Sequence, residues 1–151
     1  SGEYVSSSAI RKLLLQGNVE KAAKLLGRPY ELCGNVVDGY KVGRTIGFPT
    51  ANLCPEKGKL IPAPGVYAVW VILPNGDRYK GMLNIGNRPT LDNGDGISIE
   101  VHLLHFKGDL YNQPLSLLFG NRVRDEHRFS SLEKLQLQLR QDAVSAELLL
   151  G

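Results

Sequence analysis

A glycine-rich stretch with two basic residues is the part of the sequence best suited to binding phosphate. Its glycines are Gly34, Gly39, Gly43 and Gly47. Lys41 and Arg44 lie among them, and backbone N–H groups together with cations neutralise phosphate oxygens. The spacing Gly-x-x-x-x-Gly-Lys-Ser/Thr of a Walker loop occurs nowhere in the chain. The stretch is therefore either a phosphate-binding loop of another kind or a plain connection between strands.

Two oxygen-bearing side chains follow this stretch, two positions apart. If the chain is extended after Pro49, Thr50 and Asn52 point to the same face. A hydroxyl and an amide carbonyl are hard oxygen donors of the kind that binds Mg²⁺, usually together with water and substrate phosphates. The alternative is that both side chains bond neighbouring backbone, as Thr and Asn often do. The pair is a candidate Mg²⁺ site beside a candidate phosphate loop.

An acidic residue stands in an otherwise apolar segment near position 100. By strand alternation Glu100 faces away from its apolar neighbours Ile99 and Val101. Such a carboxylate either lies on the solvated face of the sheet or serves in a cleft as a general base, and the pattern alone leaves both open. The histidines, which have no metal-ligand spacing and are interpreted as surface or supporting residues, are His102, His105 and His127.

The segment from Tyr30 to about Val123 must position these groups, and its pattern is that of β-structure. Short runs of alternating or β-branched residues are separated by turns that contain Gly or Pro. The turn 74–77 predicts a tight hairpin between two of these runs. We expect strands at about 30–37, 51–54, 66–73, 79–85, 97–103 and 115–119. This spacing favours a small antiparallel barrel over a βαβ fold.

Helical patterns flank the strands at both ends of the chain. Ser8 and Asn18 are expected to cap two short helices, the second over residues 19–26. Near the other end, Ser130 and Glu133 form a predicted capping box. The apolar residues that then recur at helical spacing are Leu132, Leu135, Leu139, Ala143, Ala146 and Leu150. Their stripe predicts a C-terminal helix that packs on the outside of the barrel.

Composition is that of an ordinary globular domain. Of 151 residues, 42% are hydrophobic and 22% charged, which suits a single buried core. The longest apolar run, 66–73, is far shorter than the roughly 20 residues of a membrane span, and the first residues lack signal-peptide features. The net charge of +3 is scattered and aromatic residues make up only 7%, which argues against nucleic-acid binding. We expect a cytoplasmic protein with neither nucleic acid nor membrane as a partner.

Six motifs follow one another between about residues 28 and 150. They are Gly47-Phe-Pro-Thr-Ala-Asn-Leu53, Pro64-Gly-Val-Tyr67, Asn84-Ile-Gly-Asn-Arg-Pro-Thr90, Glu100-Val-His-Leu-Leu104, Asp109-Leu-Tyr111 and Arg124-Asp-Glu-His-Arg-Phe129. In this order they resemble riboflavin kinases. Agreement at several places makes the match far more specific than any one motif.

The resemblance implies a six-stranded antiparallel Greek-key barrel with a C-terminal helix outside it, working with Mg²⁺ and with ATP as co-substrate. It implies that Thr50 and Asn52 hold Mg²⁺ with the substrate phosphates, and that Glu100 is the catalytic base. The residues that it places over the ATP phosphates are Gly39, Lys41, Gly43, Arg44 and Gly47, and it implies that Phe48 beside them also takes part in binding.

Two later motifs are implied to contact the ligands from other sides. Tyr111 would lie near the adenine, although Asn112 stands where the family is expected to have Gly. Arg124 would lie in a later loop that helps to close over the flavin.

The start of the chain carries a second resemblance. The motif Ser6-Ser-Ser-Ala-Ile-Arg11 resembles the closing motif of the FMN adenylyltransferase domain of bacterial FAD synthetases, with Ser8 where Thr is usual. The His-x-Gly-His motif of that domain is missing, so this chain is not expected to make FAD. We interpret residues 1–27 as the tail and linker of the missing adenylyltransferase domain, and residues 28–151 as the riboflavin kinase domain.

The implied reaction transfers the γ-phosphoryl group of ATP to the ribityl 5′-hydroxyl of riboflavin, giving FMN and ADP. One alternative is a barrel that holds riboflavin or FMN without catalysis. Another is a barrel that binds single-stranded nucleic acid, for which stacking aromatics and clustered basic residues would be required.

Overall fold

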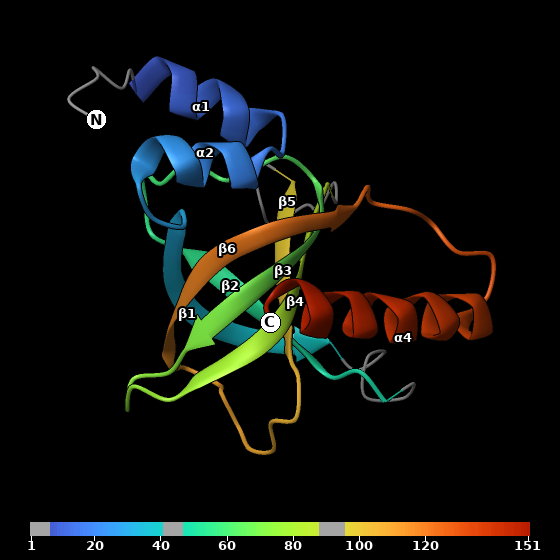
Figure 1. The fold of residues 1–151 in the computed structure, drawn as a ribbon. Coiled ribbons are helices and arrows are strands. Elements are labelled where there is room, and N and C mark those ends of the chain that lie inside the picture. The colour runs from blue at the N-terminus through green and yellow to red at the C-terminus, as the bar shows by residue number, and fades with distance from the viewer. Residues whose placement is uncertain (1–6, 41–46, 88–95) are drawn as a thin grey trace.

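The computed structural model describes residues 7–40, 47–87 and 96–151. Two short helices come first and six strands follow, with a long helix after the last strand (Figure 1). The helices are α1 (Ser7–Leu15), α2 (Val19–Leu26) and α4 (Leu132–Leu149). The strands are β1 (Glu31–Tyr40), β2 (Thr50–Pro55), β3 (Gly65–Ile72), β4 (Arg78–Asn87), β5 (Ile97–Leu103) and β6 (Pro114–Arg124).

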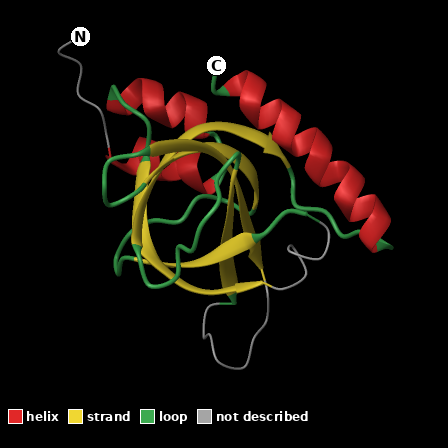
Figure 2. Ribbon diagram, turned by 90° about the horizontal axis from the view of Figure 1, so that it is seen from below, coloured by secondary structure: helices red, strands yellow, loops and turns green. Residues whose placement is uncertain are grey.

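The six strands form one closed antiparallel barrel in the order β1-β2-β5-β4-β3-β6. Consecutive strands β3, β4 and β5 are neighbours, and β6 returns to lie beside β3, which is the Greek-key arrangement. Seen from below, the strands make a ring with the helices on its outside (Figure 2). The predicted fold is confirmed in architecture and topology.

Side-chain alternation along the strands fills the barrel. In β6, for example, Leu115, Leu117 and Phe119 are buried while the residues between them are only partly so. The rings of Tyr67 and Phe119 meet edge to face at 5.2 Å between centroids. The side chains of the described strands therefore pack into one core inside the ring.

The helices α1 and α2 pack on this same core. Asn18 caps α2 by accepting a hydrogen bond from the backbone N–H of Lys21, as predicted. The helix α1 begins at Ser7, one residue before its predicted cap. Leu14, Val19 and Ala22 are fully buried in one hydrophobic cluster with barrel residues. Residues assigned to a linker from the sequence thus contribute to the core.

The helix α4 lies along the outside of the barrel, where Leu139, Ala143, Ala146 and Leu150 pack against a second apolar cluster. Its cap differs from the prediction by one residue. Ser131, not Ser130, is extended and accepts the backbone N–H of Lys134. The capping box with Glu133 is therefore wrong, because Lys134 at the third helical position has no acceptor to complete it. The predicted stripe is also wrong at its start, since Leu132 is 53% exposed.

Candidate active site

A row of side chains crosses the outer face of five strands. Strand register aligns Asn52 with Glu100, Glu100 with Asn84, Asn84 with Val66, and Val66 with Arg124. Residues directly opposite in antiparallel strands point to the same face. Residues distant in sequence are in this way brought into one line on β2, β5, β4, β3 and β6.

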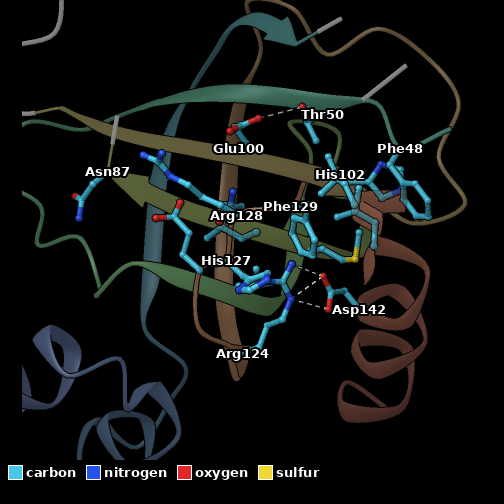
Figure 3. Close-up of a pocket in the computed structure, with 17 residues that line it drawn as sticks. Phe48, Thr50, Asn87, Glu100, His102, Arg124, His127, Arg128, Phe129 and Asp142 are labelled. Atoms are coloured by element: carbon cyan, nitrogen blue, oxygen red, sulfur yellow. Dashed lines mark hydrogen bonds and ion pairs between the residues drawn. The ribbon is translucent and has the colours of Figure 1, made fainter. Parts of the chain in front are cut away.

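A pocket of about 550 Å³ covers most of this row. Its floor is the outer face of the barrel, and its other walls are α4 and the segment 124–129 that leads from β6 towards α4 (Figure 3). This volume suits a ligand of cofactor size. The lining residues are Phe48, Thr50, Val66, Met82, Leu83, Asn84, Asn87, Glu100, His102, Arg124, Glu126, His127, Arg128, Phe129, Leu135, Leu139 and Asp142.

Glu100 lies at the bottom of the pocket and is only 8% exposed. The hydroxyl of Thr50 donates a long hydrogen bond of 3.4 Å to its carboxylate (Figure 3). Of the two environments that the sequence allowed, the structure has the cleft and not the solvated face. A carboxylate held there is suited to orienting a hydroxyl group and accepting its proton.

Thr50 and Asn52 share the outer face of β2, as their spacing predicted, and flank Glu100. Asn84 adds a buried amide oxygen, Oδ1, without a hydrogen-bond donor among the described residues. Among those residues no three His, Cys, Asp or Glu side chains gather in a way that could hold a metal ion. Hydroxyl, amide and single carboxylate oxygens fit Mg²⁺ that takes its remaining ligands from phosphate and water.

The predicted phosphate segment is described only at its ends. Gly39 belongs to strand β1 and pairs with Ala51, while Gly47 has a left-handed backbone (φ 85°) that favours glycine. Phe48 lines the pocket, with its ring edge-on to His102 at 5.3 Å. The predicted residues Lys41, Gly43 and Arg44 lie outside the described residues.

His102 is a pocket residue to which the sequence assigned no specific role. Its Nδ1–H donates to the carbonyl oxygen of Pro49 at 2.7 Å, which ties β5 to the chain just before Thr50. Burial lowers the pKa of the imidazole from its ordinary 6.5, and the bond to Pro49 opposes this in part. The ring is therefore neutral at pH 7.

The resemblance implied that Arg124 lies in a loop. In the structure it is instead the last residue of β6. Its guanidinium forms a two-pronged ion pair with Asp142 of α4, at 2.8 Å for the shortest contact (Figure 3). The guanidinium carbon also lies 5.6 Å from the centre of the Phe129 ring. Asp142 is 1% exposed, so the pair fixes one wall of the pocket to another.

Tyr111 does not line the pocket. It is 59% exposed on the connection between β5 and β6. Asn112 beside it has φ 63°, a conformation for which Gly is best suited and Asn is the usual substitute. The departure from Gly at this position therefore leaves the turn intact.

The pocket residues that the sequence did not single out include Asn84, His102, Phe129 and Asp142. Asn84 and His102 lie in motifs noted above, and their alternation with buried neighbours placed them on the outer face. No sequence pattern pointed to Asp142 as a pocket residue. It lies 18 residues from its partner Arg124, and by sequence it looks like any polar residue on the exposed side of a helix.

Comparisons with known proteins identify relatives of this chain. The family model for riboflavin kinases, Flavokinase, matches residues 26–150. A bifunctional riboflavin kinase/FMN adenylyltransferase of Haemophilus influenzae is 41% identical over 145 residues, 96% of this chain and 46% of the relative. The enzyme of the same description from Bacillus subtilis is 41% identical over 144 residues. The chain spans about half the length of these curated relatives.

Two solved structures are also similar. A Streptococcus pneumoniae protein described as a macrolide-efflux protein superposes with a TM-score of 0.89 at 38% identity, over 95% of this chain and 46% of that chain. Riboflavin kinase from Trypanosoma brucei superposes with a TM-score of 0.56 at 23% identity, over 80% of this chain and 76% of that one, which shows a shared fold. No helix in the described part of the chain is long and apolar enough to cross a membrane. The family model and the curated relatives show that this chain belongs to the riboflavin kinase family.

Proposed function

We propose that this chain transfers the γ-phosphoryl group of ATP to the ribityl 5′-hydroxyl of riboflavin, giving FMN and ADP. The observation that carries the proposal is the placement of Glu100, a buried carboxylate at the bottom of a pocket, bonded to Thr50 and aligned with Asn52. A barrel that only held a flavin would have no use for a buried base flanked by two Mg²⁺-type oxygen donors. Catalysis is therefore favoured over passive binding.

Phosphoryl transfer asks the protein mainly for positioning and charge neutralisation. Glu100 would accept a hydrogen bond from the attacking hydroxyl and then its proton as the new P–O bond forms. Thr50 and Asn52 would hold Mg²⁺, which when bound neutralises phosphate charge. The predicted Lys41 and Arg44 would add positive charge over the phosphates.

The flavin would occupy the part of the pocket between the outer barrel face and α4. Phe129, Leu135 and Leu139 offer apolar surface for a flat ring system there. Arg124, fixed by Asp142, would border this surface with a cation. In this arrangement the ribityl chain would extend from the flavin ring towards Glu100.

We also propose that the chain is the kinase part of a longer bifunctional enzyme. The length of its relatives and their description as riboflavin kinase/FMN adenylyltransferase support this. An adenylyltransferase domain would then convert the FMN made here to FAD. The Ser6–Arg11 motif would mark its end, and the whole enzyme would be cytoplasmic.

The test is a chromatographic assay of the purified chain with riboflavin, ATP and Mg²⁺. We expect equal amounts of FMN and ADP, and a turnover at least roughly 100-fold lower for Glu100→Gln, the usual loss on removing a general base. Glu147→Gln, which changes a carboxylate on α4 outside the pocket, is the control and should retain full turnover. Near-normal turnover of Glu100→Gln would exclude Glu100 as the base. Absence of FMN with the unaltered chain would refute the kinase proposal itself.

A further inference from the structure

A second arginine, Arg122, lies two residues before Arg124 but points to the other side of the sheet. Register aligns Val66 with Arg124 and the buried Tyr67 with Arg122, and a bulge between the two pairs accommodates one extra residue on β6. A β-bulge re-aims the side chains on either side of it. Arg124 therefore faces the pocket and α4, whereas Arg122 faces the end of the barrel covered by α1 and α2.

At that end Arg122 is enclosed by the turn between α1 and α2. A Cβ added to Gly17, whose φ is 80°, would lie 2.5 Å from Nε of Arg122 and 3.2 Å from the hydroxyl of Tyr67. Nε is buried without a hydrogen-bond acceptor among the described residues. The guanidinium carbon lies over the Tyr67 ring, 5.8 Å from its centroid, and one terminal nitrogen donates to the carbonyl oxygen of Pro64. The α1–α2 turn thus fixes where this guanidinium can lie.

The same guanidinium contacts Asp125, the residue that comes directly before the pocket-lining segment 126–129. Its other terminal nitrogen donates to the carboxylate of Asp125, and Arg124 donates to the backbone carbonyl of Asp125 at 3.0 Å. Glu126, the next residue, lies against Gly86 of β4 so closely that a Cβ there would collide with its carboxylate. Residues 126–129 all line the pocket, while Arg122 and Asp125 do not. The wall is therefore attached to the barrel in part through Arg122 and Asp125, which do not line the pocket.

We infer that Arg122 is a positioning residue that couples the α1–α2 turn to the wall of the flavin pocket, so that a change at Gly17 alters riboflavin binding without contact with the ligand. The inference rests on the proposed function for its ligand. The two contacts that carry it, Gly17 with Arg122 and Arg122 with Asp125, do not depend on that function. Riboflavin and not ATP is the affected substrate, because the wall residues Phe129 and Arg124 lie on the flavin side, away from Thr50.

The test compares Gly17→Ala with Gly27→Ala. Both glycines have the same left-handed backbone, with φ 80° and 78°, so both substitutions introduce similar strain. Only at Gly17 does the new Cβ meet Arg122, whereas nothing lies within 4 Å at Gly27. We expect Gly17→Ala to raise the KM for riboflavin at least about fivefold, the low end of typical coupling between two sites. The KM for ATP, and both constants in Gly27→Ala, should stay within about twofold.

Hydrogen exchange at residues 125–129 supplies a readout that needs no ligand or activity. Exchange there should be faster in Gly17→Ala than in Gly27→Ala by the same factor of about five. If the unaltered chain makes no FMN, the proposed function fails while this comparison still decides the coupling. Equal exchange and equal riboflavin KM in the two variants would overturn the inference.

A double-mutant cycle shows whether Arg122 carries the effect. In an Arg122→Gln background, Gly17→Ala should change neither the riboflavin KM nor the exchange further. Arg122→Lys, which keeps a cation near Asp125, should recover part of the loss. Should Gly17→Ala fail to fold, the contact between Arg122 and Asp125 is tested by Asp125→Ala, with Gln141→Ala at an exposed position as the control. We expect Asp125→Ala to raise the riboflavin KM about fivefold, as for Gly17→Ala. Additive effects in the cycle, or an unchanged KM in Asp125→Ala, would contradict the proposal.

Discussion

At the scale of single residues, the buried carboxylate of Glu100 is the least ordinary feature of the barrel's outer face. Taking a carboxylate out of water costs free energy unless neighbouring groups or a ligand compensate for it. Thr50 donates one long hydrogen bond, and the aligned amides of Asn52 and Asn84 complete a polar row that the fold itself does not require. Such a row is what a site built for a polar ligand needs.

Replacing Asn52 should change the Mg²⁺ concentration that the reaction requires more than it changes the maximal turnover. We expect Asn52→Ala to raise the Mg²⁺ concentration for half-maximal activity about tenfold, as the loss of about 1.4 kcal/mol of binding free energy would. Asn35→Ala, an exposed asparagine on neighbouring β1, is the control. The measurement is FMN formation against Mg²⁺ at fixed ATP. Identical titrations for the two variants would count against Asn52 as a ligand.

His102 should make the fold sensitive to acid. Burial lowers its pKa from 6.5, so the unfolded chain binds the proton more readily than the folded one. Its contribution to stability is full above the unfolded pKa and is lost as the pH falls through the lower, folded pKa. Between about pH 7 and about pH 5 the free energy of unfolding should therefore fall less in His102→Gln than in the unaltered chain. Urea titrations test this, with exposed His127→Gln as the control; parallel pH profiles would refute it.

At the scale of elements, the strands were predictable and the ends of the helices less so. Alternation, β-branched runs and turn residues together predicted all six strands, and alternation put Glu100 on the face away from Ile99 and Val101, because these signals depend only on neighbouring residues. What covers that face is a tertiary property, so alternation could not tell solvent from cleft. Neighbouring Ser130 and Ser131 fit the start of α4 equally well by type, and only the chain's path from β6 decides between them. The ion pair between Arg124 and Asp142 could not be predicted either, because no sequence spacing indicates a contact between a strand and a helix 18 residues apart.

The cap of α4 gives a matched test of that correction. Ser131→Ala should reduce the free energy of unfolding by about 1 kcal/mol, the typical value of an N-cap hydrogen bond. Ser130→Ala should change it by less than about 0.5 kcal/mol, as exposed substitutions usually do. Chemical denaturation of the two variants decides the point. A larger loss at Ser130 would restore the capping box that the sequence indicated.

At the scale of the whole molecule, the barrel and its N-terminal helices share one core. The family model begins at residue 26, near the end of α2, yet Leu14, Val19 and Ala22 are buried with barrel residues. The backbone N–H of Ala63 also donates to the carbonyl oxygen of Leu14 at 3.0 Å. We propose that the folding unit of the kinase domain starts at α1, before the boundary expected at residue 28.

Adjacent leucines in α1 test this boundary. Leu14 is 1% exposed and Leu15 is 53% exposed. Leu14→Ala should lower the free energy of unfolding by about 3 kcal/mol, in the usual range for a buried leucine. Leu15→Ala should lower it by less than about 0.5 kcal/mol. Equal effects in thermal or urea unfolding would mean that α1 is an appendage and not part of the core.

The pocket lies on the outer side of the closed ring, and this has a consequence for how sequences of this kind can diverge. The lining residues on α4 and segment 126–129 do not belong to the cluster that fills the barrel, and Leu83 is the lining residue shared with it among the described residues. Substitutions in one set leave the packing of the other in place, because side chains on opposite faces of a strand share no contacts across it. Ligand preference can therefore be selected, in nature or in the laboratory, while the core that keeps the chain folded is left untouched.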